Sequence, residues 1–212
     1  MSCPICRKRK LERYCPAKGE KICAVCCGTE REVSIDCPAD CAYLVAAHRY
    51  EDEHHKAIPP GEAPFPDVQF SADLIHEHRP TVSSLAFAIL NFAAEQPALA
   101  DADALEALAA LAETYRTLGS GIYYEKPPAA ALPRELYGAL GKFLQEFGQP
   151  GSAGANFPRP KESELFLLLV FLLRVGRNRT NGRPRTRRFL EFLRAQFPQA
   201  AAQREAPRII VP

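Results

Sequence analysis

The sequence predicts a mostly α-helical protein in two parts, a small N-terminal cysteine-rich module followed by an α-helical bundle. All eight cysteines lie within the first 41 of the 212 residues. From Ser71 onward, apolar residues recur at spacings of three and four, which is the period of an amphipathic helix. The segment from 57 to 66 holds four prolines and one glycine and cannot continue a helix. We therefore expect a module over residues 1–56, a proline-rich linker over 57–70 and a helical domain over 71–212.

The composition is typical of a globular protein and argues against a membrane span. Hydrophobic residues make up 47% of the chain and charged residues 25%. The longest apolar run has nine residues, from Leu165 to Leu173, whereas a spanning helix needs about 20. The first residues turn basic without a following apolar stretch, which is unlike a secretory signal. We expect no membrane partner and a cytoplasmic location, where cysteines stay reduced.

The spacing of the cysteines indicates metal binding. Crowded cysteines in a reducing compartment are more typical of a metal site than of disulfides. The first CxxC pair is Cys3 with Cys6, the second is Cys23 with Cys26, and sixteen residues separate the pairs. Zinc–sulfur bonds of about 2.3 Å place the sulfurs of a tetrahedral site roughly 3.8 Å apart, a distance that two such knuckles can provide. These four cysteines make one plausible zinc site.

The remaining cysteines predict a second zinc ion. Cys26 and Cys27 are neighbours whose side chains point in different directions, so they serve two ions more easily than one. Cys37 and Cys41 are four residues apart in a stretch that is typical of a helix starting near Pro38, so one ion can bridge them. An alternative partition joins the first CxxC pair to Cys37 and Cys41, and the spacing leaves it open. The expected ligands of the two ions are Cys3, Cys6, Cys15, Cys23, Cys26, Cys27, Cys37 and Cys41.

The order of these motifs resembles known zinc modules. A CxxC knuckle, then Tyr14-Cys15-Pro16, a second CxxC and a helix carrying CxxxC is similar to the treble-clef and cross-brace modules, including the HIT and MYND types. The resemblance covers about residues 1 to 50. Those two types end their pattern with a histidine and a cysteine, whereas no cysteine follows Cys41 here. The resemblance implies a compact zinc knuckle that binds protein or nucleic acid.

We interpret the metal as structural. The module has few large apolar side chains, and a structural zinc contributes roughly 10 to 16 kcal/mol of apparent binding free energy in small zinc-finger peptides. Four cysteine ligands leave no open position for a catalytic water. His48 lies about 10 Å beyond Cys41 along a helix, so we expect a solvated or packing role for it. An iron–sulfur cluster and a redox-active CxxC are the alternatives.

Capping and stop signals divide the helical domain into five main helices. Thr81 and Asp101 are the expected N-caps of the first two, and Pro133 fits the first turn of the third. The run from 165 to 173 is apolar on every side, which is typical of the buried centre of a bundle. The residues from 208 to 211 carry the only strand pattern outside the zinc knuckles. The expected helices run from about 81 to 97, 101 to 119, 133 to 148, 165 to 173 and 184 to 197.

Charge is distributed unevenly along the chain. The net charge is +1 over residues 1–56, −6 over 57–163 and +7 over 164–212. Seven arginines and no acidic residue fall within fifteen consecutive positions, and this pattern suits phosphate binding. The alternative is that they offset the acidic middle segment within one folded body. The candidate nucleic-acid-binding residues are Arg174, Arg177, Arg179, Arg183, Arg185, Arg187 and Arg188.

These patterns predict a zinc-binding protein without catalysis. The chain has no glycine-rich phosphate loop and no GxSxG elbow. We expect nucleic-acid binding through basic surfaces, with a protein-interaction adaptor held by structural zinc as the alternative. A metal-dependent enzyme or an iron–sulfur redox sensor is the remote alternative.

Overall fold

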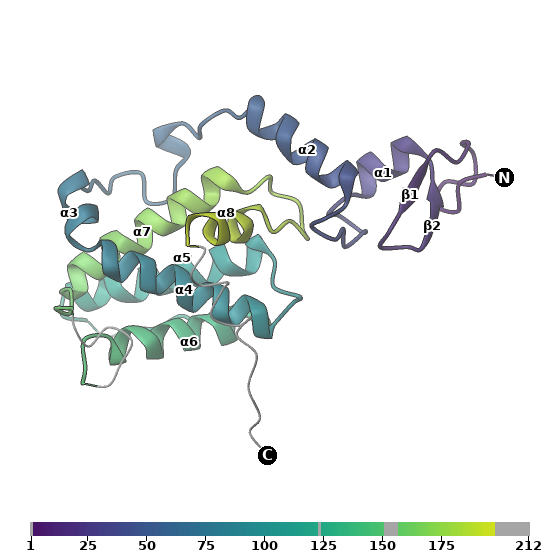
Figure 1. Ribbon diagram of the computed structural model, residues 1–212. Helices are drawn as coiled ribbons and strands as arrows, with labels where there is room; N and C mark the ends of the chain where they lie inside the picture. Colours follow the sequence, from purple (N-terminus) through teal and green to yellow (C-terminus); the bar gives the residue numbers. More distant parts are fainter. Residues whose placement is uncertain (1, 123, 151–156, 198–212) are drawn as a thin grey trace, which may run out of the picture. The chain divides into compact units, whose positions relative to one another are not determined.

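The computed structural model describes residues 2–122, 124–150 and 157–197 (Figure 1). Contacts divide the chain into two units, the first comprising 1–57 with 181–186 and the second 58–180 with 187–212. The described residues are mostly helical, with eight α-helices and one two-stranded sheet. The expected fold class is therefore confirmed. The expected strand at 208–211 lies outside the described residues.

The first unit is built on a short hairpin and two helices. Strand β1 (Arg13–Cys15) pairs antiparallel with β2 (Glu20–Ile22), and the connecting turn uses the left-handed backbone of Gly19, with φ of 68°. Helix α1 (Ala24–Glu30) begins directly after β2, and helix α2 (Ala42–Glu53) follows a loop. Because β2 leads into α1 without a linker, the second CxxC pair spans the junction of strand and helix.

Helix α2 begins later than the sequence suggests. The expected start was near Pro38, but residues 38 to 41 form a turn in which the Cys41 backbone N–H donates to the Pro38 carbonyl at 3.0 Å. Cys41 is the N-cap of α2, with an extended backbone, and Cys37 lies outside the helix. The expectation that Cys37 and Cys41 share one helical face is therefore wrong.

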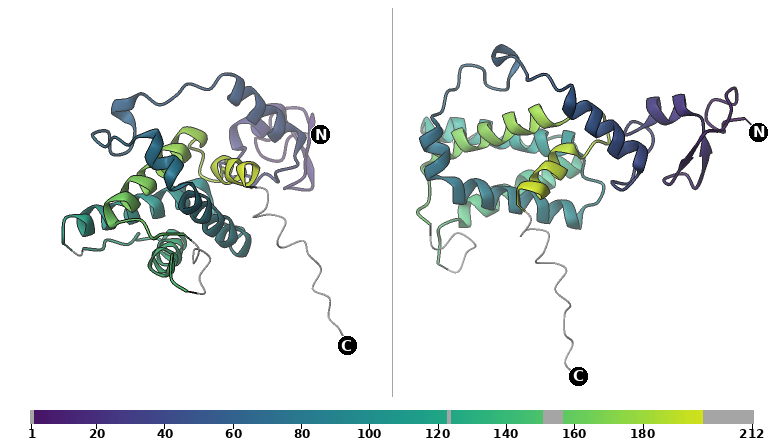
Figure 2. Two further views of the ribbon diagram at one scale, coloured as in Figure 1. Left: turned by 60° about the vertical axis from the view of Figure 1, so that its left-hand side comes forward. Right: turned by 45° about the horizontal axis from the view of Figure 1, so that its top comes forward.

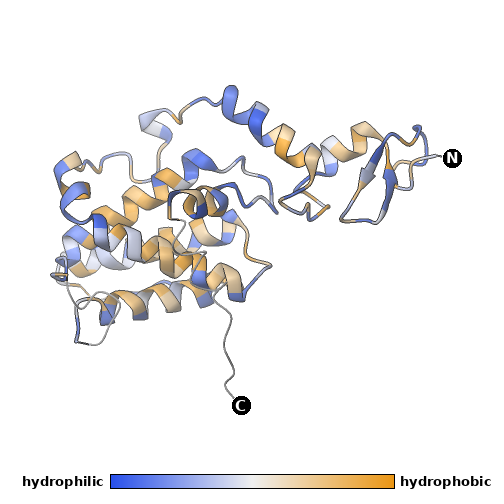
Figure 3. Ribbon diagram, viewed as in Figure 1, coloured by the Kyte–Doolittle hydropathy of each residue, from blue (hydrophilic) through white to orange (hydrophobic). Residues whose placement is uncertain are grey.

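The second unit is a bundle of helices. Its helices are α3 (Ala72–Glu77), α4 (Arg79–Glu95), α5 (Asp101–Gly119), α6 (Ala131–Glu146), α7 (Glu162–Arg179) and α8 (Arg188–Gln196), preceded by a 3₁₀ turn at Pro60–Glu62. Helix α7 packs against α5 and α8 (Figure 2). Six of its apolar residues are buried, as the all-round apolar pattern predicts, and apolar stripes mark several helices of this unit (Figure 3).

Asp101 has a different role from the expected one. Helix α5 does span 101–119 as predicted, but its N-cap is Ala100. The Asp101 carboxylate instead accepts hydrogen bonds from the backbone N–H groups of Phe189 at 2.9 Å and Leu190 at 3.3 Å. These are first-turn donors of α8, which have no partner within their own helix. This buried carboxylate helps to place the start of α8 at residue 188 rather than 184. Thr81, also expected to be an N-cap, lies inside α4.

The proline-rich segment is packed onto the second unit. Arg174 donates from Nε to the Pro64 carbonyl at 3.0 Å and from Nη2 to the Val68 carbonyl at 2.8 Å. Phe65 meets Phe166 edge to face, with ring centroids 5.5 Å apart. One arginine of α7 thus satisfies carbonyl groups in a segment that cannot form a helix.

No helix among the described residues is both long and apolar enough to span a lipid bilayer.

Candidate metal centre

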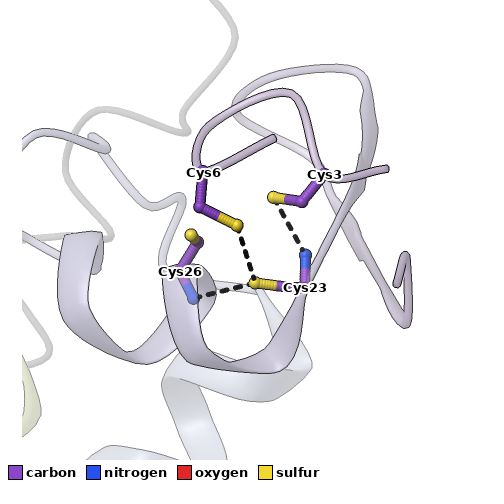
Figure 4. Close-up of side chains that lie close together, drawn as sticks. All are labelled: Cys3, Cys6, Cys23 and Cys26. Atoms are coloured by element: carbon purple, nitrogen blue, oxygen red, sulfur yellow. Dashed lines mark hydrogen bonds between the residues drawn. The ribbon is translucent and has the colours of Figure 1, made fainter. Parts of the chain in front are cut away.

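Four cysteines converge at the tip of the first unit. The sulfurs of Cys3, Cys6, Cys23 and Cys26 all lie within 4.8 Å of one another (Figure 4). The separation between the Cys6 and Cys23 sulfurs is 3.9 Å, close to the roughly 3.8 Å of a tetrahedral zinc–thiolate site. Cys3, Cys23 and Cys26 are buried. The donor set and its spacing fit one tetrahedral metal ion.

Local backbone geometry places the first CxxC pair. The Cys3 backbone N–H donates to the Arg9 carbonyl at 2.8 Å, and the Arg7 N–H donates to the Cys3 carbonyl at 2.7 Å. Arg7 adopts a left-handed backbone, with φ of 54°. These contacts close a tight loop that turns both sulfurs inward, as Figure 4 shows.

The second CxxC pair lies where β2 becomes α1. Cys23 is the N-cap of α1, and its sulfur accepts a hydrogen bond from the Cys26 backbone N–H at 3.3 Å. The Cys23 backbone N–H in turn points at the Cys3 sulfur at 3.4 Å. Donors at a helix N-terminus stabilise thiolates, the form in which cysteine binds zinc.

Burial and hydrogen bonds shift the pKa values of the thiols in this cluster. Backbone N–H groups of Lys8 and Arg9 lower the pKa of Cys6 to about 6. Burial raises the pKa of Cys3, but backbone N–H groups of Cys6, Cys23 and Ile5 outweigh it and the pKa falls. Burial, followed by hydrogen bonds with the neighbouring thiols, raises the pKa of Cys26 to about 12. A divalent cation would favour the thiolate form of all four.

Arg9 adds a positive charge next to these sulfurs. Burial lowers the pKa of its guanidinium, but the charges of Cys6 and Cys23 and hydrogen bonds to their sulfurs outweigh burial and raise it. A tetrathiolate zinc site carries a formal charge of about −2, which a neighbouring cation offsets. Arg9 therefore offsets part of the negative charge of the cluster.

The other four cysteines lie around a separate small cavity. They line one cavity of about 10 Å³, together with apolar side chains that include Ile22, Ile35 and Leu44. Among the described residues, only the first group brings four sulfurs within 4.8 Å of one another. Burial raises the pKa of Cys37, and the charges of Cys41 and Cys15 raise it further. The residues of this second group are Cys15, Cys27, Cys37 and Cys41.

The first unit also contains a buried carboxylate that the sequence did not reveal. Glu32 is only 3% exposed and has a left-handed backbone, with φ of 53°. Its carboxylate lies 3.1 Å from Nε2 of His48 and accepts a hydrogen bond from Nδ2 of Asn181 at 3.0 Å. Its carbonyl accepts from the Arg185 backbone N–H at 2.8 Å. Burial raises the pKa of Glu32, but His48 and Asn181 outweigh it and the pKa falls. His48 thus has a packing and ion-pairing role.

Several of the seven candidate arginines already bind within their own unit. Arg183 donates to the carbonyls of Gly28 at 3.2 Å and Arg31 at 2.6 Å. Arg187 donates to the carbonyls of Leu99 and Pro97, and Arg174 holds the proline-rich segment as described above. The guanidinium of Arg179 lies over the Phe192 ring, 4.3 Å from its centroid. Arg188 is half-buried, whereas Arg177 and Arg185 are exposed.

A second basic group lies on the first CxxC knuckle. Arg7, Lys8, Arg9 and Lys10 are all exposed, and the nearby Tyr14 is 56% exposed. Arg13 stacks over the Tyr43 ring, 4.7 Å from its centroid. The first unit therefore presents exposed cations on this knuckle and an exposed aromatic ring on β1.

No known family model, curated protein or solved structure matches this chain.

Proposed function

We propose that the first unit is a structural zinc module that holds two ions and binds nucleic acid without catalysis. The observation that carries the metal assignment is the convergence of four cysteine sulfurs within 4.8 Å. Sulfur donors with tetrahedral spacing favour zinc over the harder cations magnesium and calcium. Four thiolates fill the coordination sphere, so the ion stabilises the fold and leaves no position for substrate.

The second ion is assigned to the cavity lined by Cys15, Cys27, Cys37 and Cys41. A cavity of about 10 Å³ suits a single ion and excludes an organic ligand. Burial raises the pKa of Cys37, and a bound cation would compensate the cost of ionising neighbouring thiols.

Metal analysis of protein purified without added metal tests this assignment. We expect two zinc ions per chain, one lost in the double variant Cys3→Ser/Cys23→Ser and the other lost in Cys37→Ser/Cys41→Ser. The two double variants are matched controls for each other, because each removes two thiols from the same unit. One zinc in both the native chain and the second variant would limit the assignment to the first cluster. Bound iron with visible absorbance would instead indicate an iron–sulfur cluster with a redox role.

The nucleic-acid proposal rests on the first knuckle and on the arginines from 174 to 188. Arg7, Lys8 and Lys10 present exposed charges to phosphate, and an exposed tyrosine such as Tyr14 can stack on a base. The exposed guanidinium groups of Arg177 and Arg185 extend the set. Backbone phosphate contacts of this kind dominate affinity and make it dependent on salt.

A salt titration with single- and double-stranded oligonucleotides separates nucleic-acid binding from a protein-adaptor role. The logarithm of affinity should fall linearly with the logarithm of salt concentration, with a slope near −0.9 for each duplex phosphate neutralised. Arg7→Gln/Lys8→Gln/Lys10→Gln should reduce that slope by about 3. The matched control Lys126→Gln/Lys142→Gln/Arg194→Gln removes the same charge from exposed positions of the second unit and should leave it unchanged. Equal slopes in both triple variants would contradict the knuckle as a phosphate contact.

A further inference from the structure

The second unit contains an apolar cavity that the metal centre and the basic groups do not use. Its volume is about 690 Å³, and it is lined by residues of α3, α4, α7 and α8. Sites for small molecules typically occupy about 300 to 1,000 Å³. The size of this cavity therefore suits an organic ligand much better than an ion or a water molecule.

Four phenylalanines contribute to the wall of this cavity. Phe70, Phe171, Phe192 and Phe197 line the cavity, with Val175 and other aliphatic side chains between them. Phe70 and Phe171 meet edge to face, with centroids 5.8 Å apart, and Arg174 stacks on Phe70 at 5.2 Å. These contacts orient the rings of Phe70 and Phe171.

The ionisable side chains that line the cavity are all basic. Its lining includes the exposed Arg79 and the exposed His76, and no aspartate or glutamate. The acidic neighbours Asp73 and Glu77 of α3 are not among the lining residues. The structure places no acidic partner on the Arg79 guanidinium among the described residues. A cation at the edge of an apolar space complements a ligand with an apolar body and an acidic head.

A second cavity of this unit differs because its lining contains acidic residues. The cavity of about 580 Å³ lined by Leu105, Ala109 and Leu173 also contains Glu106, Glu113 and Arg177. Its carboxylates would repel an anion and compete for its arginine. A third cavity, of about 700 Å³, also has Glu106 and Glu113 in its lining. Among these three cavities of similar size, only the one at Arg79 has no acidic residue among its described lining residues.

We propose that the cavity between α3, α4, α7 and α8 binds an amphipathic anion of the fatty-acid class. The apolar chain packs against the phenylalanines, and the carboxylate pairs with the guanidinium of Arg79. Guanidinium–carboxylate pairs are directional and charge-assisted, so the head group fixes the orientation of an otherwise non-directional apolar contact. The site is independent of the proposed zinc module.

Displacement of the fluorescent probe anilinonaphthalene sulfonate from the full-length, metal-loaded protein tests the proposal. We expect dodecanoate, below its micellar concentration, to displace the probe at least about tenfold more effectively than dodecyltrimethylammonium, because the two share a chain and differ in head-group charge. Arg79→Gln should weaken dodecanoate about tenfold or more. Arg177→Gln, which removes an exposed arginine of the neighbouring cavity, should leave dodecanoate binding unchanged.

A second variant keeps the test independent of the charge. Ala72 is exposed and lines the cavity, so Ala72→Trp should occupy part of it and weaken probe binding while the far-ultraviolet circular dichroism stays native. Equal displacement by the anionic and cationic ligands would overturn the proposal. So would probe binding that Ala72→Trp leaves unchanged. A native chain that binds no probe would also overturn it. If light scattering then shows that the native chain is a dimer and that Ala72→Trp is a monomer, the occupant of the cavity is a second copy of the chain.

Discussion

The two units of this protein are stabilised by different physical interactions. The core of the first unit contains only a few buried aliphatic residues, notably Ile22 and Ile35, surrounded by cysteines. The second unit buries a continuous apolar cluster drawn from α4 to α8, with Leu85, Leu108 and Leu168 fully enclosed. A unit of the first kind needs cross-links to fold, whereas a unit of the second kind folds through the hydrophobic effect. The four changes below address this difference, from the largest expected effect to the smallest.

Metal removal should have the largest effect, and only on the first unit. A chelator withdraws roughly 10 to 16 kcal/mol of apparent binding free energy per structural zinc. In hydrogen-exchange mass spectrometry we expect residues 2–57 to lose protection. The control is internal, since α4 to α7 should keep their protection. Equal loss in both units would show that the helical bundle also depends on metal.

Asp101 should give the second unit a distinctive pH dependence. Burial raises the pKa of this carboxyl from 3.8 to about 6, although backbone N–H groups of Phe189 and Leu190 partly oppose the shift. Because the folded state binds the proton more tightly, this contribution is fully present below pH 3.8 and is lost as the pH rises through about 6. The loss amounts to about 3 kcal/mol in the free energy of unfolding.

Urea unfolding of the native chain and Asp101→Asn, followed by circular dichroism, measures that contribution. Other carboxyl groups titrate in both proteins, so the difference between them isolates Asp101. As the pH rises from 4 to 6, we expect the native chain to lose stability relative to Asp101→Asn, by an amount on the order of 3 kcal/mol. A difference that is constant with pH would contradict the raised pKa.

Replacing Gly176 of α7 with alanine should destabilise the second unit. A Cβ placed there would lie 2.5 Å from Cδ2 of Leu105 and 3.1 Å from the Phe189 ring. Overpacking at this site should cost about 1 to 3 kcal/mol. The gain of about 0.5 to 1 kcal/mol for alanine over glycine in a helix offsets part of this cost, so Gly176→Ala should still destabilise the bundle. The matched control is Gly138→Ala in α6, where a Cβ meets nothing within 4 Å. That change should stabilise the helix by about 0.5 to 1 kcal/mol, so the two midpoints in urea should move in opposite directions.

Arg9 should have the smallest of the four effects, and it acts on metal affinity. Replacing a group that neighbours metal ligands typically costs about 10-fold or more in affinity. We expect Arg9→Gln to lose zinc to a competing chelator about 10 times more readily than the native chain. Lys10→Gln, which removes a neighbouring exposed charge, should behave like the native chain. Identical competition curves for the two variants would show that Arg9 acts only as a surface charge.

The sequence by itself determined the fold class and the position of helix α5, and it marked Cys3, Cys6, Cys23 and Cys26 as one plausible metal site. Helical periodicity and CxxC spacing are local properties, so the sequence alone can show them. It also predicted the burial of α7 correctly, because a helix without a polar face has no stable exposed side. Spacing did not decide between the two partitions of cysteines, and the structure brings together Cys3, Cys6, Cys23 and Cys26.

Only the tertiary structure decided which polar groups meet across long stretches of chain. Asp101 binds the start of α8, 88 residues away, and Asn181 binds Glu32, 149 residues away. Several arginines that suggested a phosphate-binding run bind backbone carbonyls within their own unit instead, as Arg174 and Arg183 do. A buried polar group must find a partner, but the partner's place in the sequence carries no local periodicity, so it emerges only when the chain is folded.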